Sequence, residues 1–169
     1  MKNTRKMILI ANFLAIAIVL NLIESSFALT PIPGAKLGFA NVISLIILYV
    51  YSFKDSSALT ILRVILVGIL SGRLLGPTFY MSFSGAFFSI IAMGVFKKLN
   101  FFSVLGVSVI GSIFHVFGQI AAGVFVIGST AIIYWMPVML LLSIPAGVIT
   151  GLIAKKFIAL WVVWYREVS

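Results

Sequence analysis

Long stretches of apolar residues, separated by short polar breaks, make up most of this 169-residue chain. The stretches cover residues 7–29, 37–53, 58–75, 77–96, 101–127 and 132–154. A helix needs about 20 apolar residues to cross the hydrocarbon core of a bilayer, and each stretch reaches or approaches that length. Membrane-spanning strands would instead alternate between apolar and polar residues over about ten positions. The pattern therefore predicts an all-α integral membrane protein with six transmembrane helices, short loops and a single transmembrane domain.

The composition excludes several classes of protein. Hydrophobic residues make up 63% of the chain and charged residues only 9%, whereas about a quarter of a soluble domain is charged. This excludes a soluble enzyme, a secreted disulfide scaffold and a disordered chain. Because the chain has no Cys, it also lacks disulfides, thiolate nucleophiles and cysteine-based metal sites.

The basic residues predict the orientation in the membrane. With the N-terminus inside, the inner side receives nine bases: Lys2, Arg5, Lys6, Lys54, Lys97, Lys98, Lys155, Lys156 and Arg166. The outer side receives Lys36 and Arg73, and Arg63 falls within a span, from which its side chain could snorkel inward. This asymmetry follows the positive-inside rule and predicts that both termini face the cytoplasm. The membrane is expected to be a bacterial-type cell membrane. The net charge of +9 is thus mainly an orientation signal, and no nucleic-acid partner is expected.

The two ends of the chain each allow two interpretations. The first stretch, with its basic start and the small residues Ser26 and Ala28, also resembles a cleavable signal peptide, although its apolar run is long for one. Residues 155–169 either continue the sixth helix or lie along the inner interface, which suits the aromatic residues Trp161, Trp164 and Tyr165.

Small residues four positions apart indicate faces on which helices approach closely. Gly68, Gly72 and Gly76 share one face, as do Gly147 and Gly151, and internal packing explains both. Ala11 and Ala15 share a face of the first span. This pair fits internal packing or docking of a separate membrane partner.

Polar residues at membrane depth are candidate site residues. With the predicted orientation, seven of them lie toward the outer side: Glu24, Lys36, Asn41, Arg73, His115, Gln119 and Tyr134. His115 and Gln119 are four residues apart and share a helix face. The proline-containing loop 30–34 follows the first span on the same side. Two cations and a histidine against one carboxylate favour a small anionic or strongly polar ligand.

Each candidate also has a structural explanation. Glu24 and Lys36 could form an ion pair that holds a loop. His115 and Gln119 could hydrogen-bond between helices, and Asn41 could cap or cross-link them. Arg73 could anchor the chain at lipid headgroups.

The chain lacks the residues of several chemistries. It contains no phosphate-binding loop of the kind used by ATPases. Its acids, Glu24, Asp55 and Glu167, are scattered too widely for a Mg²⁺ cluster, and one His without Cys makes a zinc site unfavourable. We therefore expect no enzymatic activity, no metal and no cofactor.

Two runs of sequence resemble a known family. The run IPGAKLGFAN at residues 32–41 and the run GVSVIGSIFH at 106–115, followed by Gly118 and Gln119, resemble signatures of the Gx transporter family, also labelled heptaprenyl diphosphate synthase component I. The resemblance extends from about Ala11 to Gly151. Val116 departs from it, because an Asn is expected after the His.

The family resembles the substrate-binding (S) components of energy-coupling factor (ECF) transporters. This resemblance implies a six-helix protein that captures a micronutrient from outside, together with a coupling membrane subunit and two cytoplasmic ATPases. It also implies that Ala11 and Ala15 meet the coupling subunit.

Two hypotheses of function follow. In the first, an S-component-like subunit captures a small anionic or polar micronutrient, or a prenyl- or quinone-related precursor, through the seven candidate residues. In the second, the chain is a non-catalytic membrane accessory of prenyl diphosphate or quinone synthesis, or of an electron-transfer complex. A solitary secondary transporter is less favoured, because the spans contain few carboxylates.

Overall fold

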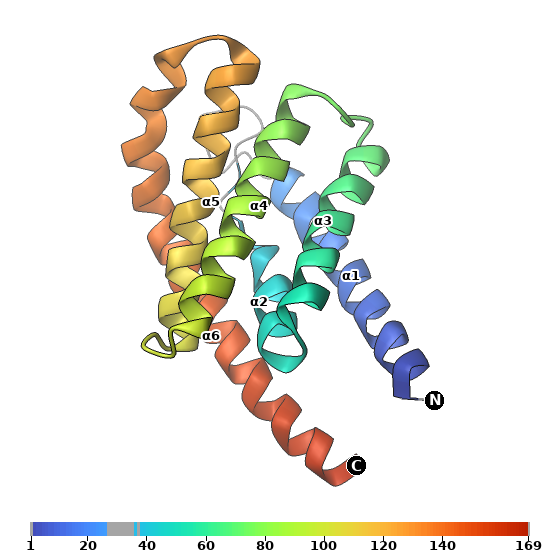
Figure 1. Cartoon of the computed structure of the whole chain (residues 1–169). Helices are drawn as coiled ribbons and strands as arrows, with labels where there is room; N and C mark the ends of the chain where they lie inside the picture. Colours follow the sequence, from blue (N-terminus) through green and yellow to red (C-terminus); the bar gives the residue numbers. More distant parts are fainter. Residues whose placement is uncertain (1, 27–35, 37, 169) are drawn as a thin grey trace.

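The computed structural model describes residues 2–26, 36 and 38–168 of the chain (Figure 1). Its α-helices are α1 (Lys2–Ser26), α2 (Asn41–Val50), α3 (Phe53–Leu70), α4 (Pro77–Lys98), α5 (Val104–Ile127) and α6 (Met136–Val168), and the 3₁₀ helix η1 (Thr130–Trp135) precedes α6. These described ranges contain no β-strand. The predicted all-helical class is confirmed.

Four of these helices are long and apolar enough to cross a membrane, namely Thr4–Ser25, Pro77–Lys98, Val104–Ile127 and the continuous stretch Thr130–Val163. Together they make the chain a multi-pass membrane protein. The helix α3 has 18 residues but carries three charges, at Lys54, Asp55 and Arg63. Where the sequence predicted six transmembrane helices, the described residues therefore form four long apolar helices, one charged helix and one short helix.

The short helix is α2, and the predicted span 37–53 is too long for it. Gly38 has a φ of +86°, a left-handed conformation that suits glycine and prevents the helix from starting earlier. The ten residues of α2 extend about 15 Å, about half of a 30 Å hydrocarbon core. All residues from Asn41 to Leu48 are buried, and α2 contacts every other α-helix. A half-length helix thus forms the centre of the bundle.

The polar break predicted at residues 54–57 is instead the first turn of α3. The Ser52 hydroxyl accepts a hydrogen bond from the Asp55 N–H at 3.2 Å and donates one to the Asp55 carboxylate at 2.5 Å. This cap satisfies N–H groups that the start of a helix otherwise leaves free. The Lys6 ammonium, 2.7 Å from the same carboxylate, joins α1 to this turn. The helix therefore begins five residues earlier than the sequence predicted.

The sixth apolar stretch is also arranged differently from its prediction. Residues 130–135 form η1, and α6 then runs without interruption to Val168. Of the two interpretations of the C-terminal residues, continuation of the helix is the one observed. Phe157 and Trp161 of this extension lie against Phe13 of α1, with ring centroids 5.7 and 5.9 Å apart.

Glycines bring α4, α5 and α6 together. A Cβ atom on Gly118 of α5 would lie 2.6 Å from the Ser84 carbonyl oxygen of α4, and one on Gly147 of α6 would lie 2.8 Å from the Val109 Cα of α5. One on Gly151 would lie 3.0 Å from the Leu105 Cα of α5. Internal packing, predicted for Gly147 and Gly151, is confirmed. Gly72, by contrast, has no neighbour within 4 Å of such an atom and lies in a turn with φ of +65°.

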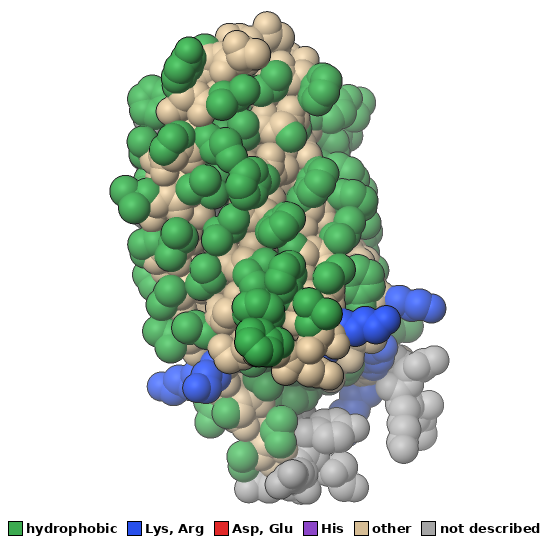
Figure 2. Space-filling model, turned by 60° about the vertical axis from the view of Figure 1, so that its left-hand side comes forward, with side chains coloured by type: hydrophobic (Ala, Val, Ile, Leu, Met, Phe, Trp, Pro, Cys, Tyr) green, Lys and Arg blue, Asp and Glu red, His purple; other side chains and the backbone are tan. Residues whose placement is uncertain are grey.

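The bundle has two distinct ends (Figure 1). The start of α1, the end of α6 and the turns α2–α3 and α4–α5 lie at one end, here called the terminal end. The α3–α4 turn and η1 lie at the opposite, distal end. Hydrophobic side chains cover the face seen in Figure 2, and Lys and Arg side chains gather on it only toward the terminal end. This distribution matches a bundle whose sides face lipid and whose terminal end faces a headgroup layer.

Candidate functional site

Buried polar side chains meet around the N-terminus of α2, in the interior of the bundle. Asn41, the first residue of α2, is only 6% exposed. Its Oδ1 accepts a hydrogen bond from Arg63 of α3 at 3.0 Å. Its Nδ2 donates to Ser89 of α4 at 3.2 Å and lies 3.3 Å from His115 Nδ1 of α5. One amide thus links four helices, and we call these residues, with Glu24, Lys36 and Gln119, the central cluster.

Arg63 of α3 also belongs to the cluster, although it is not among the site residues predicted from the sequence. It is 1% exposed, and in the described part of the chain its Nε and Nη1 atoms have no hydrogen-bond partner. The structure does not show the side chain snorkelling toward the inner membrane surface, because α3 begins at Phe53 and places Arg63 at the eleventh of its 18 residues, where it bonds Asn41 inside the bundle. The signal was nevertheless present, since an arginine midway along an apolar helix is a candidate site residue by default.

Glu24 and Lys36 form the cover of the cluster, without a direct ion pair between them. The Glu24 Oε1 atom accepts a hydrogen bond from the Gly38 N–H at 2.7 Å, while Oε2 has no partner among the described residues. The Lys36 ammonium donates to Asn21 Oδ1 at 2.5 Å. The carboxylate therefore holds the backbone just before α2, and the ammonium binds back to α1.

Gln119 holds the backbone of Lys36. This side chain is fully buried. In the amide orientation that satisfies both groups, it donates to the Lys36 carbonyl and accepts from the Lys36 N–H, each at 3.0 Å. Both ends of the amide are thereby paired, so Gln119 fixes the position of the Lys36 backbone against α5.

The cavity inside the cluster is almost closed. Its walls include Glu24, Lys36, Asn41, Arg63 and His115. Its volume is about 10 Å³, which is about the space one water molecule needs. A larger guest would have to displace the residues of the cover.

The cluster carries an excess of positive charge. Lys36 and Arg63 contribute two positive charges and Glu24 one negative charge, which leaves a formal excess of one. The N-terminus of α2 adds a positive end of a helix dipole at the same place. The site is therefore electrostatically suited to an anion.

The remaining predicted residues lie elsewhere. Arg73 is exposed in the turn after α3, and Tyr134 of η1 is 86% exposed. Neither lines the closed cavity. The predicted loop 30–34 lies outside the described residues. Ala11 and Ala15 are both exposed on α1. The structure thus brings together Glu24, Lys36, Asn41, His115 and Gln119 of the predicted set and adds Arg63, Asn21 and Ser89.

Asn21 and Ser89 were missed because a single polar residue in a helix carries little information about its face. Asn21 lies three residues before Glu24 and so shares its side of α1, which is a signal that could have identified it. Ser89 has no comparable signal, because serine also occurs in membrane helices bonded only to its own backbone.

Comparison with known proteins gives one match. Residues 13–157 match the family model described as heptaprenyl diphosphate synthase component I. No curated protein and no solved structure matches the chain.

The contact between Arg63 and Asn41 predicts a specific pattern of stability. We expect Asn41→Leu to destabilise the fold by about 3–5 kcal/mol, because it leaves a buried guanidinium without its hydrogen-bond partner. Arg63→Met should cost less, and the double variant should recover most of the loss caused by Asn41→Leu. Thermal unfolding of the four proteins in one detergent measures this cycle. Strictly additive effects of the two substitutions would show that the contact does not hold the cluster together.

Proposed function

The chain belongs to the heptaprenyl diphosphate synthase component I family, and from the chemistry of its central cluster we propose that it is a substrate-binding membrane subunit. In this proposal it captures a small anionic molecule from outside the cell for an importer of the ECF type. A micronutrient or a prenyl- or quinone-related precursor fits this description. The chain itself performs no catalysis in this role.

The observation that carries the proposal is the buried, incompletely paired charge of Arg63. A charged side chain inside a membrane protein is costly and is normally paired. Here two of its nitrogens have no partner in the described residues, and His115 Nε2 and Glu24 Oε2 are also unpartnered there. An anion that reached Nε and Nη1 of Arg63 and Nε2 of His115 would complete the hydrogen bonds of these donors and neutralise the excess charge. A purely structural cluster gains nothing from leaving these donors free.

The charge balance supports a ligand with one acidic group. Lys36, Arg63 and Glu24 sum to one positive charge, which a monoanion compensates. A more highly charged ligand would require Arg73 or a protonated His115 to contribute as well. Tyr134 and Arg73 then belong to the outer approach to the site, because both are exposed on the distal side of the bundle.

The proposed route runs from the distal end. We place the terminal end in the cytoplasm and both termini inside, in a bacterial-type cell membrane, which is supported by the bases at that end (Figure 2). The N-terminus of α2 then lies about 15 Å from the inner surface, near the middle of the membrane. Substrate arriving from outside would meet Lys36 and Gly38 first, and displacement of this cover would admit it.

An external motor fits the same proposal. The chain has no ATPase motif, and the proposed importer would therefore include a coupling membrane subunit and two cytoplasmic ATPases. Ala11 and Ala15 are exposed on α1 and would allow close approach of a partner helix. We therefore propose this face of α1 as the docking face for the coupling subunit.

The family description favours a second candidate function, in which the chain is an accessory subunit of prenyl diphosphate synthesis. Chemistry on a prenyl diphosphate uses Mg²⁺ held by carboxylates. The chain has three acids, and one of them, Asp55, is engaged by Lys6 and Ser52. Such a role would be that of a membrane partner, and the same alternative extends to quinone synthesis and electron-transfer complexes.

Ligand retention tests the substrate-binding proposal directly. Wild-type protein purified from its native membrane should carry an acidic small molecule that mass spectrometry detects. We expect Lys36→Gln, Arg63→Met and His115→Gln each to reduce its occupancy at least tenfold, because each removes a donor to the anion. Lys54→Gln is the matched control, since it removes one exposed positive charge from α3. Unchanged occupancy in both Lys36→Gln and His115→Gln would overturn the site assignment.

Affinity capture from native membranes distinguishes the two candidate functions. A coupling subunit with an ATPase pair should co-purify with the wild-type chain, and Ala15→Leu should reduce its recovery at least fivefold by preventing close helix contact. Ala121→Leu is the control, because Ala121 is a similarly exposed small residue on α5. Capture of a prenyl synthase subunit without ATPases would favour the accessory role instead.

A further inference from the structure

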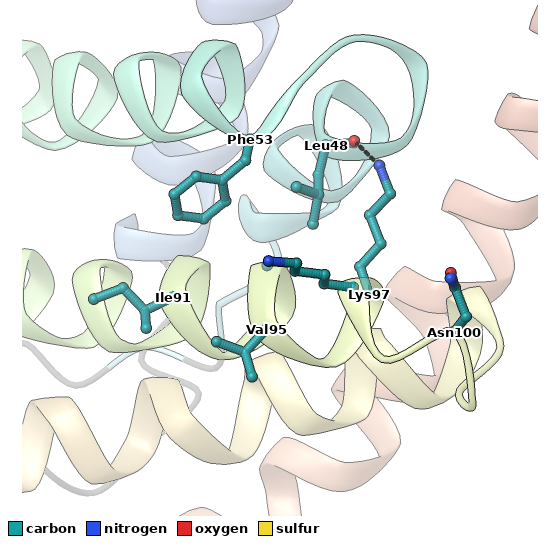
Figure 3. A pocket seen from close by; sticks show the side chains of 8 residues that line it. Leu48, Phe53, Ile91, Val95, Lys97 and Asn100 are labelled. Carbon is teal, nitrogen blue, oxygen red and sulfur yellow. Dashed lines mark hydrogen bonds between the residues drawn. The ribbon is translucent and has the colours of Figure 1, made fainter.

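A second cavity, remote from the central cluster, lies at the terminal end where α2 ends, α3 begins and α4 ends (Figure 3). It has a volume of about 530 Å³. Its walls are formed mainly by the apolar side chains of Leu48, Phe53, Ile91 and Val95. Phe53, Ile91 and Val95 are each at least 40% exposed, so the cavity is a groove that opens on the side of the bundle.

Gly94 determines the shape of this groove. A Cβ atom on Gly94 would lie 2.4 Å from a ring carbon of Phe53. The Phe53 ring therefore rests against the backbone of α4, which only glycine permits at this position. The result is an aromatic ring over α4, whose residues Ile91 and Val95 also line the groove (Figure 3).

The charged residues that line the groove are Lys97 and Lys98, which lie together in the last turn of α4, and Asn100 lines it just beyond the helix. Lys97 donates a hydrogen bond to the Leu48 carbonyl of α2 at 2.6 Å and lies 4.9 Å from the centre of the Tyr49 ring. Lys98 is exposed. Within the described part of the chain, no carboxylate pairs with either lysine and no acidic residue lines the groove. Two ammonium groups thus face an apolar groove without a counter-ion.

We propose that this groove binds an anionic phospholipid, with the phosphate at Lys97 and Lys98 and an acyl chain along Phe53, Ile91 and Val95. The two chemistries of the groove follow the two parts of such a lipid, since the two lysines lie in the last turn of α4 at the terminal end, whereas Ile91 and Val95 lie earlier in α4, toward the distal end (Figure 1). Basic pockets between membrane helices are suited to anionic headgroups. A free phosphate would leave the apolar wall unused, and a zwitterionic lipid would leave the two lysines without a net counter-charge.

Native mass spectrometry of the full-length protein with dioleoyl lipids tests this proposal. Wild-type protein should bind phosphatidylglycerol at least fivefold more tightly than phosphatidylcholine. Lys97→Gln/Lys98→Gln should abolish the preference, whereas the matched double variant Lys155→Gln/Lys156→Gln, which removes two exposed charges from α6, should retain it. Because Lys97 also holds α2, Lys98→Gln alone is the second variant, and it should lower the preference at least twofold without loss of thermal stability.

The apolar part of the site has its own test. Val95→Trp keeps both lysines and fills the groove, so phosphatidylglycerol should bind at least fivefold more weakly. An unchanged preference in both Lys98→Gln and Val95→Trp would overturn the proposal, as would equal loss of preference in the α6 double variant. Displacement of the lipid by glycerol phosphate at equal concentration would identify a free-phosphate site instead. If these substitutions leave lipid binding unchanged but release a protein partner from the membrane, the groove is a protein-docking surface.

Discussion

The bundle is arranged around one constraint, which is the burial of the Arg63 guanidinium and the hydrogen bond that it donates to Asn41. A charge at this depth must be compensated by the protein, because lipid offers it no hydrogen bonds. The Asn41 Oδ1 atom accepts the hydrogen bond from Arg63, and its Nδ2 atom contacts Ser89 of α4 and His115 of α5. One amide therefore links α2 to α3, α4 and α5, and an apolar cluster that includes Leu45, Ile47 and Met93 packs around this link.

The half-length of α2 follows from the same constraint. Its N-terminus has to lie inside the bundle for Asn41 to reach Arg63, and the described residues just before it, 36 and 38–40, are non-helical. Irregular backbone at such depth requires protein partners for its polar groups. Glu24 accepts from the Gly38 N–H, and Gln119 pairs with the backbone of Lys36. The residues that close the cavity are thus the same ones that make the short helix possible.

The two ends of α2 carry opposite partial charges and have different surroundings. The positive N-terminal end faces the central cluster, where the described residues leave an excess of one positive charge. The negative C-terminal end is met by Lys97 through the Leu48 carbonyl, beside the lipid-sized groove. A single short helix therefore connects the proposed substrate site in the interior of the bundle with the proposed lipid site at the terminal end. Movement of α2 would affect both.

The apolar pattern by itself determined that the chain is helical and belongs in a membrane, because lipid-facing helices need continuous apolar stretches whatever their packing. Five members of the central cluster also follow from sequence, because polar residues are so scarce that each one stands out. Only the tertiary structure decided that α2 is half-length, that α3 begins at the Ser52 cap, and that the Arg63 side chain points into the bundle. These features depend on partners distant in sequence, namely Asn41 for Arg63 and Lys6 for Asp55. Hydropathy measures the cost of burying each residue alone, whereas the position of a buried charge is set by the residue that pairs with it.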